Sequence, residues 1–145
     1  MTLGVASAAS FGSVAAADTP PEPRAAVSVR AGPLRNSRGS IACRLHKSSE
    51  GFPRDRAGTV AQRVKVSGQF TTCSFEGLAP GTYAIVIHHD ENDNRKFDTN
   101  ALGIPVEGYG VSNNRTHALS APRWEEAKFT LAAGQTRELE IALRY

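Results

Sequence analysis

The chain lacks the features by which nucleic-acid-binding and membrane-spanning proteins are most easily recognised. Its 17 Lys and Arg residues are scattered, the net charge is only +3, and no basic stripe is interleaved with aromatic side chains. Nucleic-acid binding generally needs such a stripe. The stretch from Leu3 to Ala17 is uncharged, but it is too short and too rich in Ala, Ser and Gly to span a bilayer. We therefore expect neither a nucleic-acid partner nor a membrane span.

A catalytic motif is also missing. Ser112, His89 and Asp90 are the residue types of a catalytic triad, but no nucleophile elbow surrounds the serine, and an adjacent His and Asp cannot orient each other. Asp98 and Glu107 form a candidate carboxylate pair whose separation the sequence does not give. We therefore expect a non-catalytic protein, with a hydrolase as the less favoured alternative.

Patterns for long helices are absent, whereas turn-forming residues are common. Thirteen Gly and eight Pro in 145 residues favour short strands and many turns. Alternating or apolar runs predict strands around residues 27–29, 40–46, 60–66, 69–75, 83–89, 129–131 and 137–145. This pattern predicts an all-β fold, a single antiparallel β-sandwich of about seven strands over residues 26–145.

Two of these runs carry further expectations. Residues 83–89 are apolar at nearly every position, which is typical of a central strand covered on both faces. Residues 137–145 alternate, with Leu139, Ile141, Leu143 and Tyr145 on one face. This alternation predicts a half-buried antiparallel strand that closes the chain.

The N-terminal 25 residues have the composition of a leader and a linker. Residues 1–17 carry no charge, and Ala15-Ala16-Ala17 forms a small-residue cleavage site before Asp18. They predict a signal peptide and a periplasmic or secreted protein, with a disordered Ala-rich tail as the alternative. Because Lys and Arg are absent from residues 1–3, either the true start lies upstream or the leader is weak. Residues 18–25 contain three prolines and predict a linker.

The chain contains only two cysteines, Cys43 and Cys73, and each lies on the apolar phase of its own predicted strand. In an exported protein an even count favours pairing. We expect the two side chains to meet across the core in a disulfide that stabilises the fold by roughly 3–4 kcal/mol. Two separate buried thiols are the alternative.

Oxygen-bearing side chains alternate directly after the apolar run 83–87. Asp90, Asn92, Asn94 and Asp98 occupy positions 1, 3, 5 and 9 of a loop, and Lys96 stands at position 7, where a backbone carbonyl serves as ligand. This spacing is typical of a loop that wraps a hard cation. The sequence therefore predicts a calcium-binding loop.

The predicted calcium site is a weak one. Position 12 is Ala101, so the bidentate Glu of a helix-flanked calcium loop is absent, and Glu107 is the candidate for the missing carboxylate. Few carboxylates imply a dissociation constant of roughly 10⁻⁴–10⁻³ M. The alternative is an Asx-rich turn in which Asp90, Asn92 and Asn94 cap their own backbone without metal.

Two further pairs of residues adjoin this loop or follow it. His88 and His89 should lie on opposite faces of their strand, and we expect His89 to hydrogen-bond the loop backbone. Tyr109 and Trp124 are the candidate surface of a carbohydrate- or peptide-binding module, which is the alternative function to a calcium-stabilised module. The partner is then an unidentified protein or carbohydrate.

The chain resembles a family of bacterial exported proteins known only as a domain of unknown function. The resemblance rests on Gly77 to Ala84, His89 to Asn92, Asn94, Lys96, Asp98, Gly103 to Pro105, Glu107 to Gly110 and Ser112 to Asn114. The turn from Leu78 to Tyr83 also resembles carboxypeptidase-regulatory-like and Cna-B-like sandwiches of the transthyretin type, which implies a prealbumin-like topology. The resemblance implies no activity.

The chain departs from this family at one position of the loop. Family members usually have Gly after the third ligand position, where Arg95 stands here. A sharp turn at this position requires a left-handed backbone, which costs a non-glycine residue about 1 kcal/mol. The resemblance therefore implies either a lower affinity or a lost ion.

Overall fold

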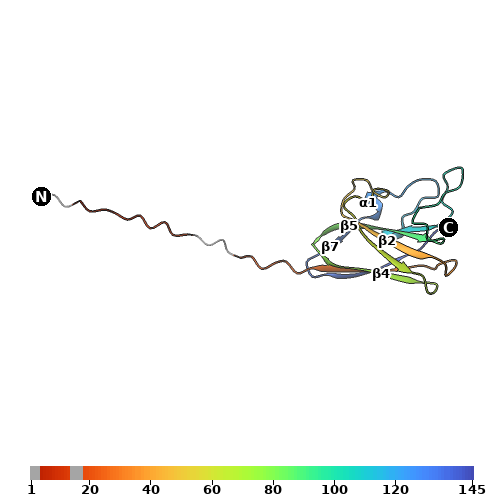
Figure 1. Ribbon diagram of the computed structural model, residues 1–145, viewed down its shortest axis with the longest axis horizontal. Helices are drawn as coiled ribbons and strands as arrows, with labels where there is room; N and C mark the ends of the chain where they lie inside the picture. The colour runs from red at the N-terminus through yellow and green to blue at the C-terminus, as the bar shows by residue number, and fades with distance from the viewer. Residues whose placement is uncertain (1–3, 14–17) are drawn as a thin grey trace.

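The computed structural model describes residues 4–13 and 18–145 and is almost entirely β within them (Figure 1). Its regular elements in chain order are β1 Ala25–Ala31, β2 Ser40–His46, β3 Val60–Lys65, β4 Thr71–Leu78, β5 Gly81–Asp90, β6 Gly108–Val111, the 3-10 turn η1 Ser112–Asn114, α1 Trp124–Ala127, β7 Phe129–Leu131 and β8 Thr136–Ile141. The eight strands confirm the predicted all-β sandwich of about seven strands, and the helical turn at α1 is its only α-helix in the described residues.

The strands form two sheets. The first has the order β4-β1-β8, and the second has the order β3-β2-β5-β6, with β7 also paired to β5. The ten-residue β5 is therefore the central strand of the second sheet, because it pairs with three others.

The last strand differs from its prediction in direction and length. β8 pairs with β1 in parallel, from Ala26 opposite Thr136 to Ala31 opposite Ile141. It ends at Ile141, and the chain then crosses to the second sheet, where Arg144 forms an antiparallel bridge with Tyr109. The predicted antiparallel strand over 137–145 is wrong on both points, because alternation specifies which face is buried and not the direction of the partner.

The hydrophobic core lies between the two sheets. Val27 and Val29 of the first sheet and Ile85 and Ile87 of the second are among its fully buried members. On the other face of β5, Ala84 packs in a second, smaller cluster with residues of α1 and β6. The prediction that β5 is covered on both faces is confirmed at Ala84, whereas Val86 and His88 on the outer face are only half-buried.

The predicted disulfide between Cys43 and Cys73 is present and joins the two sheets through the core. Cys43 lies on β2 and Cys73 on β4, with a Cα–Cα distance of 6.5 Å. Both side chains are fully buried. The bridge closes a separation of 30 residues, so it restricts the unfolded chain considerably.

The segment before β1 has no regular secondary structure in the described residues 4–13 and 18–24, and those residues are exposed. The predicted cleavage site at 15–17 lies outside the described residues. β1 begins at Ala25, the last residue of the predicted linker. In the described part of the chain, no helix has the length and apolar character needed to cross a membrane.

Candidate functional site

The predicted ion loop begins at the end of β5. Asp90 is the last residue of this strand, pairs with Ser40 of β2 and is fully buried. Gly39 lies directly against it with a φ of +71°, and a Cβ atom on Gly39 would stand 1.9 Å from the Asp90 carbonyl oxygen. The start of the loop is therefore fixed by the sheet and by a close backbone contact that only glycine permits.

The carboxylate of Asp90 shapes the first turn of the loop. Its Oδ1 accepts a hydrogen bond from the Asn94 N–H at 3.1 Å, and its Oδ2 accepts one from the Arg95 N–H at 2.8 Å. Asp93 and Arg95 have left-handed backbone conformations, with φ of 56° and 62°. The predicted positive φ at Arg95 is confirmed.

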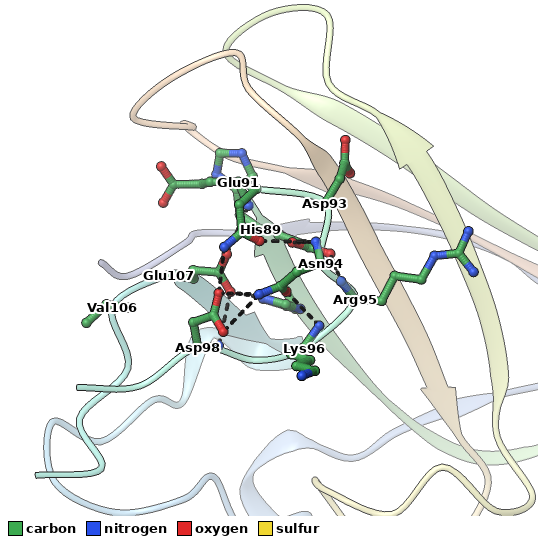
Figure 2. Close-up of polar contacts among 12 residues, drawn as sticks. His89, Glu91, Asp93, Asn94, Arg95, Lys96, Asp98, Val106 and Glu107 are labelled. Carbon is green, nitrogen blue, oxygen red and sulfur yellow. Dashed lines mark hydrogen bonds and ion pairs between the residues drawn. The ribbon is translucent and has the colours of Figure 1, made fainter. Parts of the chain in front are cut away.

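The side-chain amides of Asn92 and Asn94 converge on Asp98, and Figure 2 shows the contact between Asn94 and Asp98. The Asn92 side-chain amide donates to the Asp98 carboxylate at 2.8 Å, and the Asn94 amide donates to its two oxygens at 3.0 and 2.8 Å. The oxygen of Asn92 accepts from the Asn94 N–H at 3.1 Å, and that of Asn94 accepts from the Lys96 N–H at 2.8 Å. The loop thus has the Asx-turn network that was the alternative prediction. The side chains of Asn92, Asn94 and Asp98 are brought together, whereas the Asp90 carboxylate bonds backbone N–H groups and Arg63.

Glu107 reaches the loop from the residue before β6, and its predicted role as an ion ligand stays a prediction. One of its oxygens accepts a hydrogen bond from the Glu91 N–H at 3.1 Å, and the other accepts one from the Asp98 N–H at 3.1 Å. The second oxygen also lies 2.7 Å from Nε2 of His88. The buried Glu107 side chain therefore connects the two ends of the loop, at Glu91 and at Asp98.

Basic side chains from neighbouring strands neutralise the acids at the edge of the loop. Arg63 on β3 pairs with Asp90, and Lys65 on the same strand pairs with Asp93. Arg35 pairs with Glu91 at 2.5 Å. Sequence reasoning missed these partners because they lie 27 to 56 residues away in the chain. The pairing of β2 with β3 and β5 brings them together.

These contacts shift the acids toward the charged form. Burial tends to raise the pKa of Asp90, but hydrogen bonds from the Arg63 side chain and the Arg95 N–H outweigh it, so the pKa lies below its ordinary value. Glu91 behaves in the same way: burial tends to raise its pKa, and the hydrogen bond from Arg35 makes the largest lowering contribution. Hydrogen bonds from Lys65 and Ser40 lower the pKa of Asp93 to about 2. All three therefore carry negative charge at neutral pH.

The two histidines of β5 point to opposite faces, as predicted. His88 packs edge-on against Phe97, with ring centroids 5.0 Å apart. His89 is fully buried, and its Nε2 lies 2.8 Å from the carbonyl oxygen of Arg38 and its Nδ1 2.8 Å from the Tyr145 hydroxyl. The expectation that His89 bonds the ion loop is therefore wrong. His89 instead hydrogen-bonds the turn before β2, at Arg38, and the C-terminal residue Tyr145. Both partners are too distant in sequence to be inferred.

Tyr109 and Trp124 lie in different environments. Tyr109 is half-buried, packs edge-on against Phe97 with ring centroids 6.0 Å apart, and donates its hydroxyl to the His117 carbonyl at 3.2 Å. Trp124 is also half-buried and packs edge-on against Phe52, with centroids 5.7 Å apart. Ligand binding by this pair stays a prediction.

The composition of the loop limits which ion it can hold. Within residues 4–13 and 18–145, no three His, Cys, Asp or Glu side chains are grouped as a metal site. The oxygen donors that the loop offers a cation are the Asp98 carboxylate, the amide oxygens of Asn92 and Asn94, and backbone carbonyls. Oxygen donors of this kind suit calcium rather than a transition metal.

The fold and the loop together define a small, disulfide-bridged β-sandwich domain with a polar loop pinned to one edge. The chain belongs to a bacterial family described as "Uncharacterized protein conserved in bacteria (DUF2141)", whose model matches residues 29–139. This confirms the resemblance to a bacterial family of unknown function, and the matched region includes the whole loop and Glu107. No curated protein and no solved structure matches the chain.

Proposed function

We propose that this protein is an exported, non-catalytic β-sandwich module whose loop 90–98 binds calcium weakly as a structural ion. The observation that carries the proposal is the convergence of the Asn92 and Asn94 amides on the partly exposed carboxylate of Asp98. Rotating these two amides by about 180° exchanges the positions of their nitrogen and oxygen atoms. Three side chains then present oxygen to one point.

Calcium compensates for the hydrogen bonds that this rotation removes. The rotation gives up the amide contacts to Asp98 and the two contacts from the N–H groups of Asn94 and Lys96. Calcium accepts six to eight oxygen ligands, so backbone carbonyls and water complete the shell. Asp90 stays bonded to the backbone, where it preserves the turn.

The same contacts make the proposed site weak. Asp90 is paired with Arg63, and the carboxylate of Glu107 is occupied by two N–H groups and His88, which leaves Asp98 as the carboxylate most available to an ion. One available carboxylate corresponds to a dissociation constant of roughly 10⁻⁴–10⁻³ M.

Export is the other part of the proposal. Disulfides such as Cys43–Cys73 persist in oxidising compartments and are rare in the cytosol. Together with the uncharged segment 1–17, the bridge supports a periplasmic or secreted location. The transthyretin-type topology implied by the turn at 78–83 is part of the same proposal.

Thermal melting of the full chain in chelator, calcium and magnesium tests the proposed function. At about 10 mM calcium and a dissociation constant of about 1 mM, binding to the folded state adds about 1.4 kcal/mol, a rise in Tm of about 4–6 °C. The variant Asp98→Asn should remove this rise. It should also lower the Tm in chelator, because it removes one acceptor oxygen from the Asn92 and Asn94 amides, so the difference between calcium and chelator is the measurement that counts. Asp55→Asn, outside the loop, is the matched control and should retain the rise. An equal response to magnesium, or no response to calcium, rejects the proposal.

A further inference from the structure

A groove runs over the outer face of the second sheet, on the side away from the sandwich core. Ala42 of β2 and Val86 of β5 form part of its floor, because each is one residue out of phase with the core-facing positions of its strand. Phe97 and Tyr109 form one wall. The groove has a volume of about 320 Å³, within the range of small-molecule sites.

Three arginine residues, Arg44, Arg54 and Arg56, line this groove, and no carboxylate among the described residues does. Arg44 donates to the Thr59 hydroxyl at 3.2 Å, and Arg56 donates to the Arg95 carbonyl at 3.3 Å. None of the three is ion-paired in the described part of the chain, where the ion pairs are made by other basic residues.

The nearest acid in sequence does not neutralise this group. Asp55 stands between Arg54 and Arg56, but its carboxylate accepts the Ala57 N–H at 2.9 Å and it lines a separate hollow beside His46. Burial, and then the nearby charge of Arg56, lowers the pKa of the Arg44 guanidinium. An anion in the groove would offset both effects, because it supplies hydrogen-bond acceptors and opposite charge.

The apolar part of the groove continues beyond the arginines. A second hollow of about 430 Å³ shares Arg54, Phe97 and Tyr109 with the first. Its walls include Leu102 and Leu119, which are 83% and 92% exposed, and the half-exposed Ile104. Exposure of apolar side chains to water is unfavourable. An apolar ligand that covers them would therefore bind with a favourable free energy.

We propose that this groove binds a single-chain anionic amphiphile, a carboxylate with an unbranched hydrocarbon tail. Arg44, Arg54 and Arg56 bind the carboxylate, and the tail lies along Phe97 toward Leu102 and Leu119. The charge complementarity specifies the head group, and the continuity of the two hollows specifies the tail. The groove shares Phe97 with the loop 90–98, but none of the proposed calcium ligands Asn92, Asn94 and Asp98 lines it.

Calorimetric titration of the full chain with decanoate in the presence of chelator tests this proposal. We expect one decanoate per chain, binding of decyltrimethylammonium at least about tenfold weaker, and binding of acetate more than about a hundredfold weaker. The first comparison isolates the charge of the head group, and the second isolates the tail. Chelator prevents the calcium loop and insoluble calcium soaps from affecting the result.

Two matched pairs of substitutions locate the site. Arg54→Gln with Arg56→Gln should weaken decanoate binding about tenfold or more. Arg24→Gln with Arg137→Gln makes the same change in net charge away from the groove and should leave the affinity unchanged. Thermal melting verifies that both pairs are folded. Absence of decanoate binding, equal binding of the cationic amphiphile, or equal affinity in the two variant pairs overturns the proposal.

Discussion

The buried carboxylate of Asp90 accepts the backbone N–H of Arg95, five residues further along the chain, at 2.8 Å. This contact connects the end of the central strand β5 to the left-handed turn of the loop. Arg95 has a φ of 62°, so the loop contains the left-handed turn that was expected at this position.

Arg95→Gly should stabilise the protein slightly. Glycine removes a left-handed strain of about 1–2 kcal/mol but adds about 0.4–1 kcal/mol of unfolded-state entropy, so we expect a net gain of about 0.5 kcal/mol. The gain should be the same in chelator and in calcium, as measured by urea unfolding in each. A gain seen only with calcium would show that the free loop does not hold this turn.

Arg63→Gln should destabilise the protein by about 2 kcal/mol, because it leaves the charge of buried Asp90 without its side-chain donor. Urea unfolding measures the change. Arg30→Gln breaks the exposed pair with Glu140 and should cost less than about 1 kcal/mol. Equal effects of the two substitutions contradict the structural role assigned to Arg63.

Stability should decrease in acid. Asp90, Glu91 and Asp93 have lowered pKa values in the folded state, that of Asp93 about 2, so the unfolded chain binds more protons at acid pH. Their contribution is complete above about pH 5 and is lost as the pH falls through about 4 toward 2. Urea midpoints across this range should show the decline.

Lys65→Gln tests the contribution of Asp93 to this decline. Removing Lys65 takes away the largest cause of the lowered Asp93 pKa, so the loss of stability at low pH should become shallower. Lys47→Gln, just beyond the opposite end of β2, should retain the original slope. Identical slopes in both variants contradict the assignment.

Reduction of the Cys43–Cys73 bridge should lower the free energy of unfolding by about 3–4 kcal/mol, because it releases a loop of about thirty residues in the unfolded chain. Urea unfolding with and without reductant measures the difference. Two titratable thiols in the protein before any reduction contradict the predicted bridge.

Local patterns predicted the strands because burial of alternate residues leaves a direct trace in the sequence. The run 40–46 coincides with β2, and the phase of Cys43 correctly placed it in the core. The direction of β8 was predicted wrongly, because alternation is more typical of antiparallel strands, whereas the half-buried β8 alternates and still pairs in parallel with β1.

The hydrogen-bond network of the loop could be predicted as far as its contacts are local. Asn92, Asn94 and Asp98 are close in sequence, and their side chains meet in the structure. Their role as ion ligands stays a prediction. The crossing of the C-terminus over β6 could not be inferred, although its trace is visible: a Cβ atom on Gly110 would stand 2.6 Å from the Ala142 carbonyl oxygen. A glycine in the sequence can indicate that another segment packs closely against the backbone at that position, but it does not identify that segment.

The most direct test of the calcium proposal is a titration followed by the backbone amide resonances of the isotopically labelled full chain. We expect saturable shifts at Asn92, Asn94 and Lys96 with one dissociation constant of roughly 10⁻⁴–10⁻³ M. The resonances of β1 should not move, and magnesium should not reproduce the shifts. Shifts spread over the acidic surface without saturation, or no shift in the loop, contradict the proposal and leave the loop as an Asx-turn network held by Asp90 and Glu107.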